Sequence, residues 1–434
     1  MLHVAVIGSG PAGYYCAEGL QQSLGDEVAV DLIDRLPVPY GLIRFGVAPD
    51  HQSIKAVSRR YEKVALSPHI RFVGNVAVGT DIAVAELQHL YDAVVVATGA
   101  PRDRPLDIPG SSLPGVIGSA AFVGWYNGHP EFQDIDPPLD GNTAVVIGNG
   151  NVALDVARIL SKSRREFDGS DIVDHALDRL MASRLRTIRI VGRRGPHQIA
   201  MTSKELGELG RLELAAPIVD AADFPPLESD SALETGQRKS LAHLREFASR
   251  PIDQDRKRIR FDFFAQPLAI EGDGSVERIR LGRTRLDDEG NARPTGETFD
   301  VPCGLIVSCI GYRSAPIDGL PYDEPLGRFV NENGVIAPGV YCVGWARRGP
   351  TGTIGTNRPD GFEVAEHIAA HASGGSGKSG GQGLDALLAA RGKEVVSFSD
   401  WRRIEETEVA RARPGAPREK MTIVADMLRT AHPE

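Results

Sequence analysis

Apolar residues along this chain fall into short runs that alternate with longer stretches of mixed character. The runs Leu2–Ile7 and Val28–Ile33 are typical of buried strands, and the residues between them, as far as about Leu24, favour a helix. Arg71–Val78 is expected to be a further strand. The apolar centre of Tyr91–Thr98 indicates a strand that is buried on both faces, as in a parallel sheet. The N-terminal part of the chain therefore predicts a strand–turn–helix–strand unit.

The same order of elements returns in the middle of the chain. Asn142–Ile147 is a predicted strand, about Asn151–Ser161 a helix, and Thr187–Val191 the next strand. Leu305–Cys309 is an apolar run followed by a glycine, and it repeats the pattern of the run that ends at Gly99. Two units with one order of elements predict a duplicated architecture.

Three stretches interrupt these units. Pro101–Pro114 is rich in proline and indicates a crossover between domains. Lys162–Arg186 is highly charged, and we expect it to be mainly helical and solvated. His371–Gly383 is rich in glycine and serine, which is typical of a flexible segment. With 434 residues the chain is too long for one ordinary core. The predicted division is a discontinuous domain of residues 1–104 and 317–434, and a second domain of residues 105–316.

Each unit carries a glycine-rich turn between its first strand and its helix. The turns are GSGPAG at Gly8–Gly13 and GNGNVA at Gly148–Ala153. Gly8 and Gly148 would make the tight turn, Gly10 and Gly150 would let the backbone approach a pyrophosphate, and a small third residue lets helix and strand pack. The pyrophosphate would then meet the positive end of the helix. Two such turns in the right context predict two dinucleotides and redox transfer between them.

The end of the second strand in each unit indicates which dinucleotide binds there. Asp34 ends the first one, and a carboxylate at this place suits an unphosphorylated ribose, as in FAD or NAD. Arg193 and Arg194 end the second one, and two guanidinium groups suit the 2′-phosphate of NADP. An ordinary turn aspartate and a surface arginine pair are the alternatives. One ligand should be a flavin, because a flavin accepts two electrons and releases them singly.

Composition narrows the function further. The net charge of −9 argues against a nucleic-acid partner, and no apolar run is long enough to span a bilayer, so we expect no membrane insertion and a cytoplasmic location. The four cysteines form no CxxC pair and no group with zinc spacing, so no metal is expected. That spacing also argues against disulfide-exchange chemistry and against a cysteine-bound iron–sulfur cluster.

Several longer motifs resemble the adrenodoxin reductase-like branch of the ferredoxin–NADP reductases. Besides the two glycine turns they are PVPYGLIRFGVAPDH at Pro37–His51, VGRRGP at Val191–Pro196 and VGWARRGPTGTIGTN at Val343–Asn357. The resemblance covers nearly the whole chain. It implies an α/β fold with two Rossmann-like, three-layer (ββα-type) nucleotide-binding domains in a glutathione-reductase-like architecture. It further implies NADPH oxidation, reduction of bound FAD, and single-electron delivery to a ferredoxin-type iron–sulfur protein.

The resemblance also implies individual binding residues. Those for FAD would be Ala12, Asp34, Leu42, Val78, Trp345, Gly352, Thr353 and Ile354, while Gly13 is the small third residue of the turn. Those for NADP would be Asn149, Asn151, Val152, Arg193, Arg194, Glu205 and Gly352. The family usually has Glu where this chain has Asp34, one methylene shorter, which affects the details of the ribose contact.

Three side chains are candidates for catalysis at the nicotinamide. The resemblance implies a role for His51 and Glu208 there, and His51 would act by position and charge; its alternative is a loop cap after Pro-Asp. Glu208 and Asp155 either pair with His51 or with the nicotinamide amide, or they are solvated helix residues. A different NADPH-dependent flavoprotein, such as a diaphorase or a monooxygenase, and a non-catalytic dinucleotide sensor remain as alternative functions.

A basic cluster offers a docking face for an acidic iron–sulfur protein, with a solvated surface as its alternative. Its members are Arg245, Arg250, Arg256, Lys257, Arg258 and Arg260.

Overall fold

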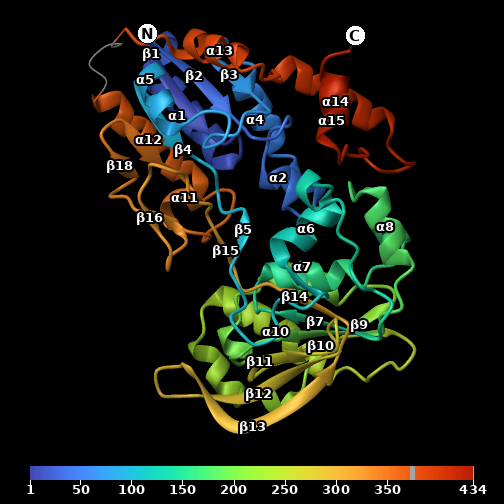
Figure 1. The fold of residues 1–434 in the computed structure, drawn as a ribbon. Coiled ribbons are helices and arrows are strands. Elements are labelled where there is room, and N and C mark those ends of the chain that lie inside the picture. Colours follow the sequence, from blue (N-terminus) through green and yellow to red (C-terminus); the bar gives the residue numbers. More distant parts are fainter. Residues whose placement is uncertain (372–376, 434) are drawn as a thin grey trace.

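Two six-stranded sheets organise the chain, one in each of two lobes that meet at a narrow waist (Figure 1). The structure is a computed structural model, and it describes residues 1–371 and 377–433. The strand order is β18-β19-β4-β1-β2-β3 in the first lobe and β6-β14-β7-β8-β10-β9 in the second. Both chain termini lie in the first lobe.

The first sheet is parallel except at its β18 edge. Its strands are β1 (Leu2–Ile7), β2 (Val28–Ile33), β3 (Ile70–Val73), β4 (Ala93–Val96), β18 (Val335–Ala337) and β19 (Val340–Cys342). Alternate residues of β1 face opposite sides, as a pleated strand requires: Val4 and Val6 join one apolar cluster, and Ala5 and Ile7 join another. Both faces are therefore buried, which explains why these strands are continuously apolar.

Helices cover the two faces of this sheet. The side of Val4 packs on α1 (Pro11–Leu24), α4 (Ser58–Ala65), α12 (Asn357–His371), α14 (Phe398–Ala410) and α15 (Val424–Ala431). The side of Ala5 packs on α5 (Val84–Leu90) and α13 (Gly380–Ala390). The lobe also holds the short elements α2 (Leu42–Phe45), α3 (Gln52–Lys55), β16 (Tyr322–Asp323), β17 (Arg328–Phe329) and α11 (Trp345–Arg348).

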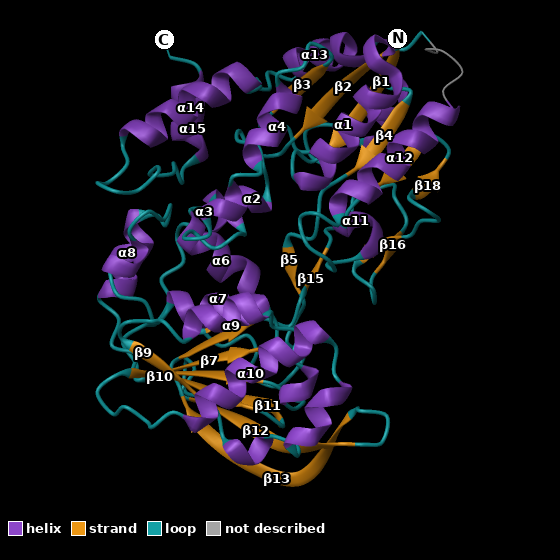
Figure 2. Ribbon diagram, turned by 180° about the vertical axis from the view of Figure 1, so that it is seen from behind, coloured by secondary structure: helices purple, strands orange, loops and turns teal. Residues whose placement is uncertain are grey.

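The second lobe has the three layers that the family resemblance implied. Its parallel sheet contains β6 (Val116–Gly118), β7 (Thr143–Ile147), β8 (Thr187–Val191), β9 (Ala215–Ile218), β10 (Lys257–Asp262) and β14 (Leu305–Ser308). One face packs on helices, which include α6 (Ser119–Asn127), α7 (Asn151–Ile159), α8 (Asp174–Met181), α9 (Ser203–Leu209) and α10 (Thr235–Ser249). The other packs on a three-stranded antiparallel sheet of β11 (Ala265–Glu271), β12 (Arg278–Leu286) and β13 (Ala292–Pro302). Figure 2 shows that sheet at the end of the molecule far from the waist.

The chain crosses the waist twice, and the two crossings pair with each other. β5 (Arg102–Asp103) lies antiparallel to β15 (Tyr312–Arg313). The Asp103 carboxylate also accepts hydrogen bonds from the backbone N–H of Ala120 (2.8 Å) and from the Ser119 hydroxyl (3.1 Å), at the start of α6. The waist is thus tied to the first helix of the second lobe.

One expectation about the connecting stretches is wrong, and a second is wrong at its C-terminal end. Lys162–Arg186 is not a solvated helical excursion, because α8 is its only α-helix among the described residues and Ile172 and Val173 are fully buried. Gly380–Gly383, the end of the predicted flexible segment, form the first turn of α13; residues 372–376 of that segment lie outside the described residues. Both errors arose because composition does not report tertiary contacts.

Candidate functional site

The first glycine turn has the shape that a pyrophosphate site needs. Gly8 has a φ of +112°, and a Cβ there would lie 2.5 Å from the carbonyl oxygen of Ala97. A Cβ on Gly13 would lie 2.1 Å from the Gly8 carbonyl oxygen, so the third glycine permits the close approach of helix and turn. A Cβ on Gly10 would meet nothing within 4 Å. The turn is therefore closed toward the sheet and open in front of the α1 N-terminus.

The second turn repeats this geometry. Gly148 has a φ of +147°, and its Cβ would lie 2.4 Å from the Cys309 carbonyl oxygen. Gly150 faces open space, and Ala153 is fully buried where the first turn has its third glycine. Open backbone in front of a helix N-terminus is the structural requirement for a bound pyrophosphate, so both turns fit a dinucleotide.

Asp34 lies at the end of β2 and already has partners in the first turn. One of its carboxylate oxygens accepts hydrogen bonds from the Ser9 backbone N–H (2.9 Å) and the Ser9 hydroxyl (2.6 Å). The other accepts from the Leu36 N–H (3.0 Å). Asp34 thus positions the glycine turn itself, and one lone pair, on the oxygen that binds Leu36, is left to accept from a ribose hydroxyl.

The segment that contains Trp345 and Gly352 lies against the same turn, although it is far away in sequence. A Cβ on Gly344 would lie 2.6 Å from the Ala12 Cβ in the first turn of α1. The Trp345 indole N–H donates to the Thr351 carbonyl (3.0 Å), and Gly352 and Thr353 are exposed. The remaining candidates for FAD are the exposed Leu42 and the half-buried Val78 and Ile354.

The candidates for NADP gather around the second turn. The Asn151 side-chain oxygen accepts from the Thr202 N–H (2.9 Å), and the buried Asn149 side-chain oxygen has no hydrogen-bond partner. Arg193 and Arg194 follow β8 and are exposed. Within the described part of the chain, neither guanidinium has a hydrogen bond or an ion pair, so both are free to bind an anion.

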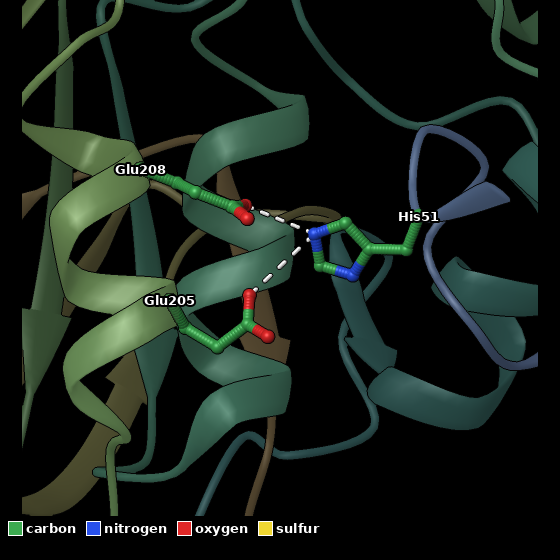
Figure 3. A group of neighbouring side chains, drawn as sticks. All are labelled: His51, Glu205 and Glu208. Carbon is green, nitrogen blue, oxygen red and sulfur yellow. Dashed lines mark hydrogen bonds and ion pairs between the residues drawn. The ribbon is translucent and has the colours of Figure 1, made fainter. Parts of the chain in front are cut away.

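The catalytic candidates from the two lobes come together in one cluster. His51 Nε2, from the loop before α3, lies 2.9 Å from Glu208 Oε2 on α9 and 3.5 Å from Glu205 Oε2. Figure 3 shows both glutamates pointing from one helix toward the imidazole. Asp155 joins the cluster through Arg158, whose guanidinium contacts Asp155 (2.7 Å) and His51 Nε2 (3.1 Å). His51 thus belongs to the first lobe and its partners to the second.

The cluster perturbs the acidity of its members. Burial opposes a charge on His51, but the hydrogen bond to Glu208 and the nearby carboxylates outweigh it and raise the pKa of His51 above its usual value. Burial, with the charges of Asp155 and Glu208, raises the pKa of Glu205. Burial also raises the pKa of Asp155, against the opposing effect of Arg158. Perturbed groups of this kind gather where protons are held or moved.

Sequence reasoning missed two members of this cluster, Arg158 and Asp50. Arg158 is buried on α7 and donates to the Asp50 carboxylate, which also accepts from Lys162. The only signal was an arginine within the apolar stretch NVALDVARIL, three residues after Asp155. Ligand atoms of His51, Glu205 and Glu208 lie within 4.8 Å of one another, an arrangement that could hold a metal ion. The Arg158 guanidinium, however, lies 3.1 Å from His51 Nε2, and its positive charge opposes a metal cation at that nitrogen.

The cysteines have no disulfide partner. Cys16, Cys303 and Cys342 are buried, and burial raises the pKa of each thiol to about 12. Cys309 is also unpaired, and burial raises the pKa of its thiol. Thiols held protonated in this way are poor nucleophiles.

The predicted basic cluster is largely occupied by internal contacts. Arg245 binds Asp230, Arg250 binds Glu246, and Arg260 binds Asp262. Arg256 and Lys257 donate to backbone carbonyls. These contacts reduce the free positive charge that this face can offer to a partner.

Three comparisons with known proteins agree with one another. The family model for pyridine nucleotide-disulphide oxidoreductases matches residues 2–189. NADPH-ferredoxin reductase FprA of Mycobacterium leprae is 43% identical over 99% of this chain and 98% of its own length. Human mitochondrial NADPH:adrenodoxin oxidoreductase is 43% identical over 98% of this chain and 91% of its own. The structure of Mycobacterium tuberculosis FprA in complex with NADPH superimposes with a TM-score of 0.96 at 40% identity, over 99% of this chain and 100% of that one. No helix among the described residues is both long enough and apolar enough to span a membrane.

Proposed function

This chain belongs to the family of NADPH-ferredoxin reductase FprA and NADPH:adrenodoxin oxidoreductase, and from that premise we propose that it is an FAD-dependent ferredoxin–NADP(+) reductase. When bound, FAD supplies the chemistry that connects hydride transfer from NADPH to single-electron transfer. The protein's part is to hold both dinucleotides, to orient them and to set the charge around them. The structure contains residues suited to each of these tasks.

The first lobe would hold FAD. Gly10 leaves the α1 N-terminus open to its pyrophosphate, and Asp34 secures the turn that surrounds this opening. Gly352 and Thr353, in the segment packed on Ala12, would lie along the other side of the cofactor. The Asp34 carboxylate at the end of β2 favours FAD over a 2′-phosphorylated nucleotide at this turn. The next residue, Arg35, is paired with Glu131 of the second lobe.

The second lobe would hold NADP(H). The open backbone at Gly150 would receive the pyrophosphate, and Arg193 and Arg194 would bind the 2′-phosphate through charge-assisted hydrogen bonds. Asn149 has a buried side-chain oxygen without a hydrogen-bond partner, and Glu205 Oε2 has only the 3.5 Å contact with His51. A bound nucleotide can supply a hydrogen-bond donor to each.

The observation that carries the proposal is the 2.9 Å contact between His51 and Glu208. His51 belongs to the lobe proposed for FAD and Glu208 to the lobe proposed for NADP(H). Their contact therefore marks a place where flavin and nicotinamide can meet. We propose that His51, Glu208 and Asp155 orient the nicotinamide and adjust the charge beside it. Hydride transfer itself requires no side-chain base, which agrees with a cluster that holds protons rather than one that must remove them.

A ferredoxin-type iron–sulfur protein is the proposed electron acceptor. The relatives' names specify ferredoxin and adrenodoxin as their partners. The protonated, unpaired cysteines of this chain favour an external acceptor over internal disulfide exchange. They also agree with a reducing compartment, and we propose a cytoplasmic location, which cell fractionation would test.

We further propose domain boundaries at residues 104/105 and 316/317. The paired crossings β5 and β15 support them, since each lies between the last strand of one sheet and the first strand of the next.

Anaerobic reduction of the purified protein tests the function. We expect a yellow protein whose visible flavin absorption is bleached by NADPH and recovers on mixing with an oxidised ferredoxin. A yellow protein that NADPH bleaches but ferredoxin does not reoxidise would instead favour a diaphorase or monooxygenase. A colourless protein would favour the non-catalytic sensor.

A further inference from the structure

Among the residues that the structure describes, Arg158 is the one fixed positive charge that touches His51. Its side chain is 2% exposed, and it lies on α7 between the loop of Asp50 and the helix of Glu208. Its guanidinium contacts Asp50, Asp155 (2.7 Å), His51 Nε2 (3.1 Å) and Glu208 Oε2 (3.4 Å). One side chain therefore holds four members of the cluster, on two lobes, in a common arrangement.

Two neighbours make opposite demands on the same nitrogen. Arginine can only donate hydrogen bonds, so Arg158 requires a lone pair on His51 Nε2. An ionised Glu208 can only accept, so it requires a proton on that nitrogen. Nε2 has either one lone pair or one proton, so only one of the two contacts can be satisfied at a time. A lone pair satisfies Arg158, whereas a proton satisfies Glu208 but places two cations 3.1 Å apart.

The other charges around His51 are mostly negative. The charged groups near it are Asp50 of its own loop, Asp155 and Arg158 of α7, Lys162 beyond the end of α7, which binds Asp50, and Glu205 and Glu208 of α9. Four are carboxylates, and of the two cations only Arg158 contacts the imidazole. Arg158 opposes a proton on His51, whereas Glu208, Asp155 and Glu205 favour one, so removal of Arg158 would raise the pKa of His51 further.

We propose that Arg158 is a positioning residue of the reductase, whose fixed charge opposes the proton that Glu208 favours on His51 Nε2. This inference rests on the proposed function, because it places that proton at the nicotinamide end of the NADPH site. No bond other than that to the proton forms or breaks, and no electron moves. Arg158 sets the charge that the nicotinamide meets without touching it.

The direct test is to titrate His51 in the FAD-loaded enzyme by NMR of histidine-labelled protein, with His51→Gln to identify its signal. In Arg158→Gln we expect the His51 midpoint to rise by about one pH unit or more, a tenfold change in proton affinity. Arg158→Lys keeps the charge and should restore most of the original midpoint. The control is Arg164→Gln, an exposed arginine paired with Asp178, which should leave it unchanged.

Loss of a buried charge can prevent folding, so a second variant keeps the test decisive. Arg158→Gln with Asp155→Asn removes one charge of each sign, and its His51 midpoint should lie between those of the wild type and Arg158→Gln. A folded variant without Arg158 whose His51 midpoint equals that of the wild type would overturn the proposal. The NMR readout does not depend on turnover, so a wild-type enzyme that failed to reduce ferredoxin would refute the proposed function separately.

Discussion

Lys420 and Asp171 form a buried contact between the C-terminal segment and the second lobe. The Lys420 ammonium donates to the Asp171 backbone carbonyl (2.8 Å) and lies 3.1 Å from its carboxylate. The same carboxylate binds Lys55 of the first lobe (2.6 Å). Asp171 thus connects three segments that are distant in sequence. Figure 1 shows the C-terminal helices beside the first lobe and the chain before α15 turning toward the second.

Asp171→Asn should destabilise the protein in a pH-dependent way. Burial alone would raise the pKa of the Asp171 carboxyl, but Lys420 and Lys55 outweigh it and lower the pKa to about 2. Because this folded-state pKa is below the unfolded one, the carboxylate stabilises the fold above about pH 4, and this contribution is lost as the pH falls toward about 2. Leaving the two lysines unpaired should cost about 3–5 kcal/mol near neutral pH.

Urea unfolding across this pH range measures the effect. The matched control is Asp178→Asn, which removes an exposed partner of Arg164 and should change the unfolding free energy by less than about 1 kcal/mol. Equal stability of Asp171→Asn and the wild type near neutral pH would contradict the role given to Asp171.

Alanine at Gly10 or Gly150 should weaken ligand binding without disturbing the fold. A Cβ at either position meets no protein atom within 4 Å, and neither residue has a positive φ, so the added methyl group can clash only with a bound nucleotide. Overpacking of about 1–3 kcal/mol corresponds to roughly a five- to 150-fold loss of affinity. Gly10→Ala should lower FAD content, and Gly150→Ala should raise the KM for NADPH.

Three measurements separate these effects. Flavin absorbance per chain reports FAD content, KM reports NADPH binding, and the melting temperature shows whether the fold is disturbed. Gly236→Ala is the control, because Gly236 also faces open space but lies on the surface helix α10. If Gly10→Ala binds FAD as tightly as Gly236→Ala does, the first turn is not the pyrophosphate site.

Replacement of Arg193 or Arg194 by alanine should reduce the preference for NADPH over NADH. Each lost charge-assisted hydrogen bond is worth roughly 1.5–3 kcal/mol, or about ten- to 150-fold in affinity. The KM for NADPH should rise while that for NADH stays the same, and Arg164→Ala should change neither. An unaltered KM for NADPH in the double variant would remove both arginines from the phosphate site.

Sequence reasoning predicted the local elements of this fold well. The runs around β1, β2, β7 and β8 lie within one residue of the observed strands, because a buried parallel strand is apolar throughout. The glycine turns were equally visible, since Gly8 and Gly148 adopt backbone angles that few other residues reach. Both signals are local, so a single sequence contains them.

The contacts between distant segments could not be predicted in the same way. Asp171 and Lys420 are charged residues in polar stretches, and such residues are usually solvated. They are buried here because each compensates the other, and neither sequence position indicates its partner. Arg158 lies in an apolar stretch, but its partners Asp50 and His51 are about 100 positions away in sequence, so it was missed as well. His51 and Glu208 were found only through the family resemblance.

A crystal structure of the FAD-loaded protein with NADP+ bound tests the central claim most directly. That claim is that the two turns serve a common site at the His51–Glu208 contact. It predicts the isoalloxazine and nicotinamide rings in contact with each other, beside His51, with the 2′-phosphate on Arg193 and Arg194. Two nucleotides bound in separate, distant clefts would contradict it.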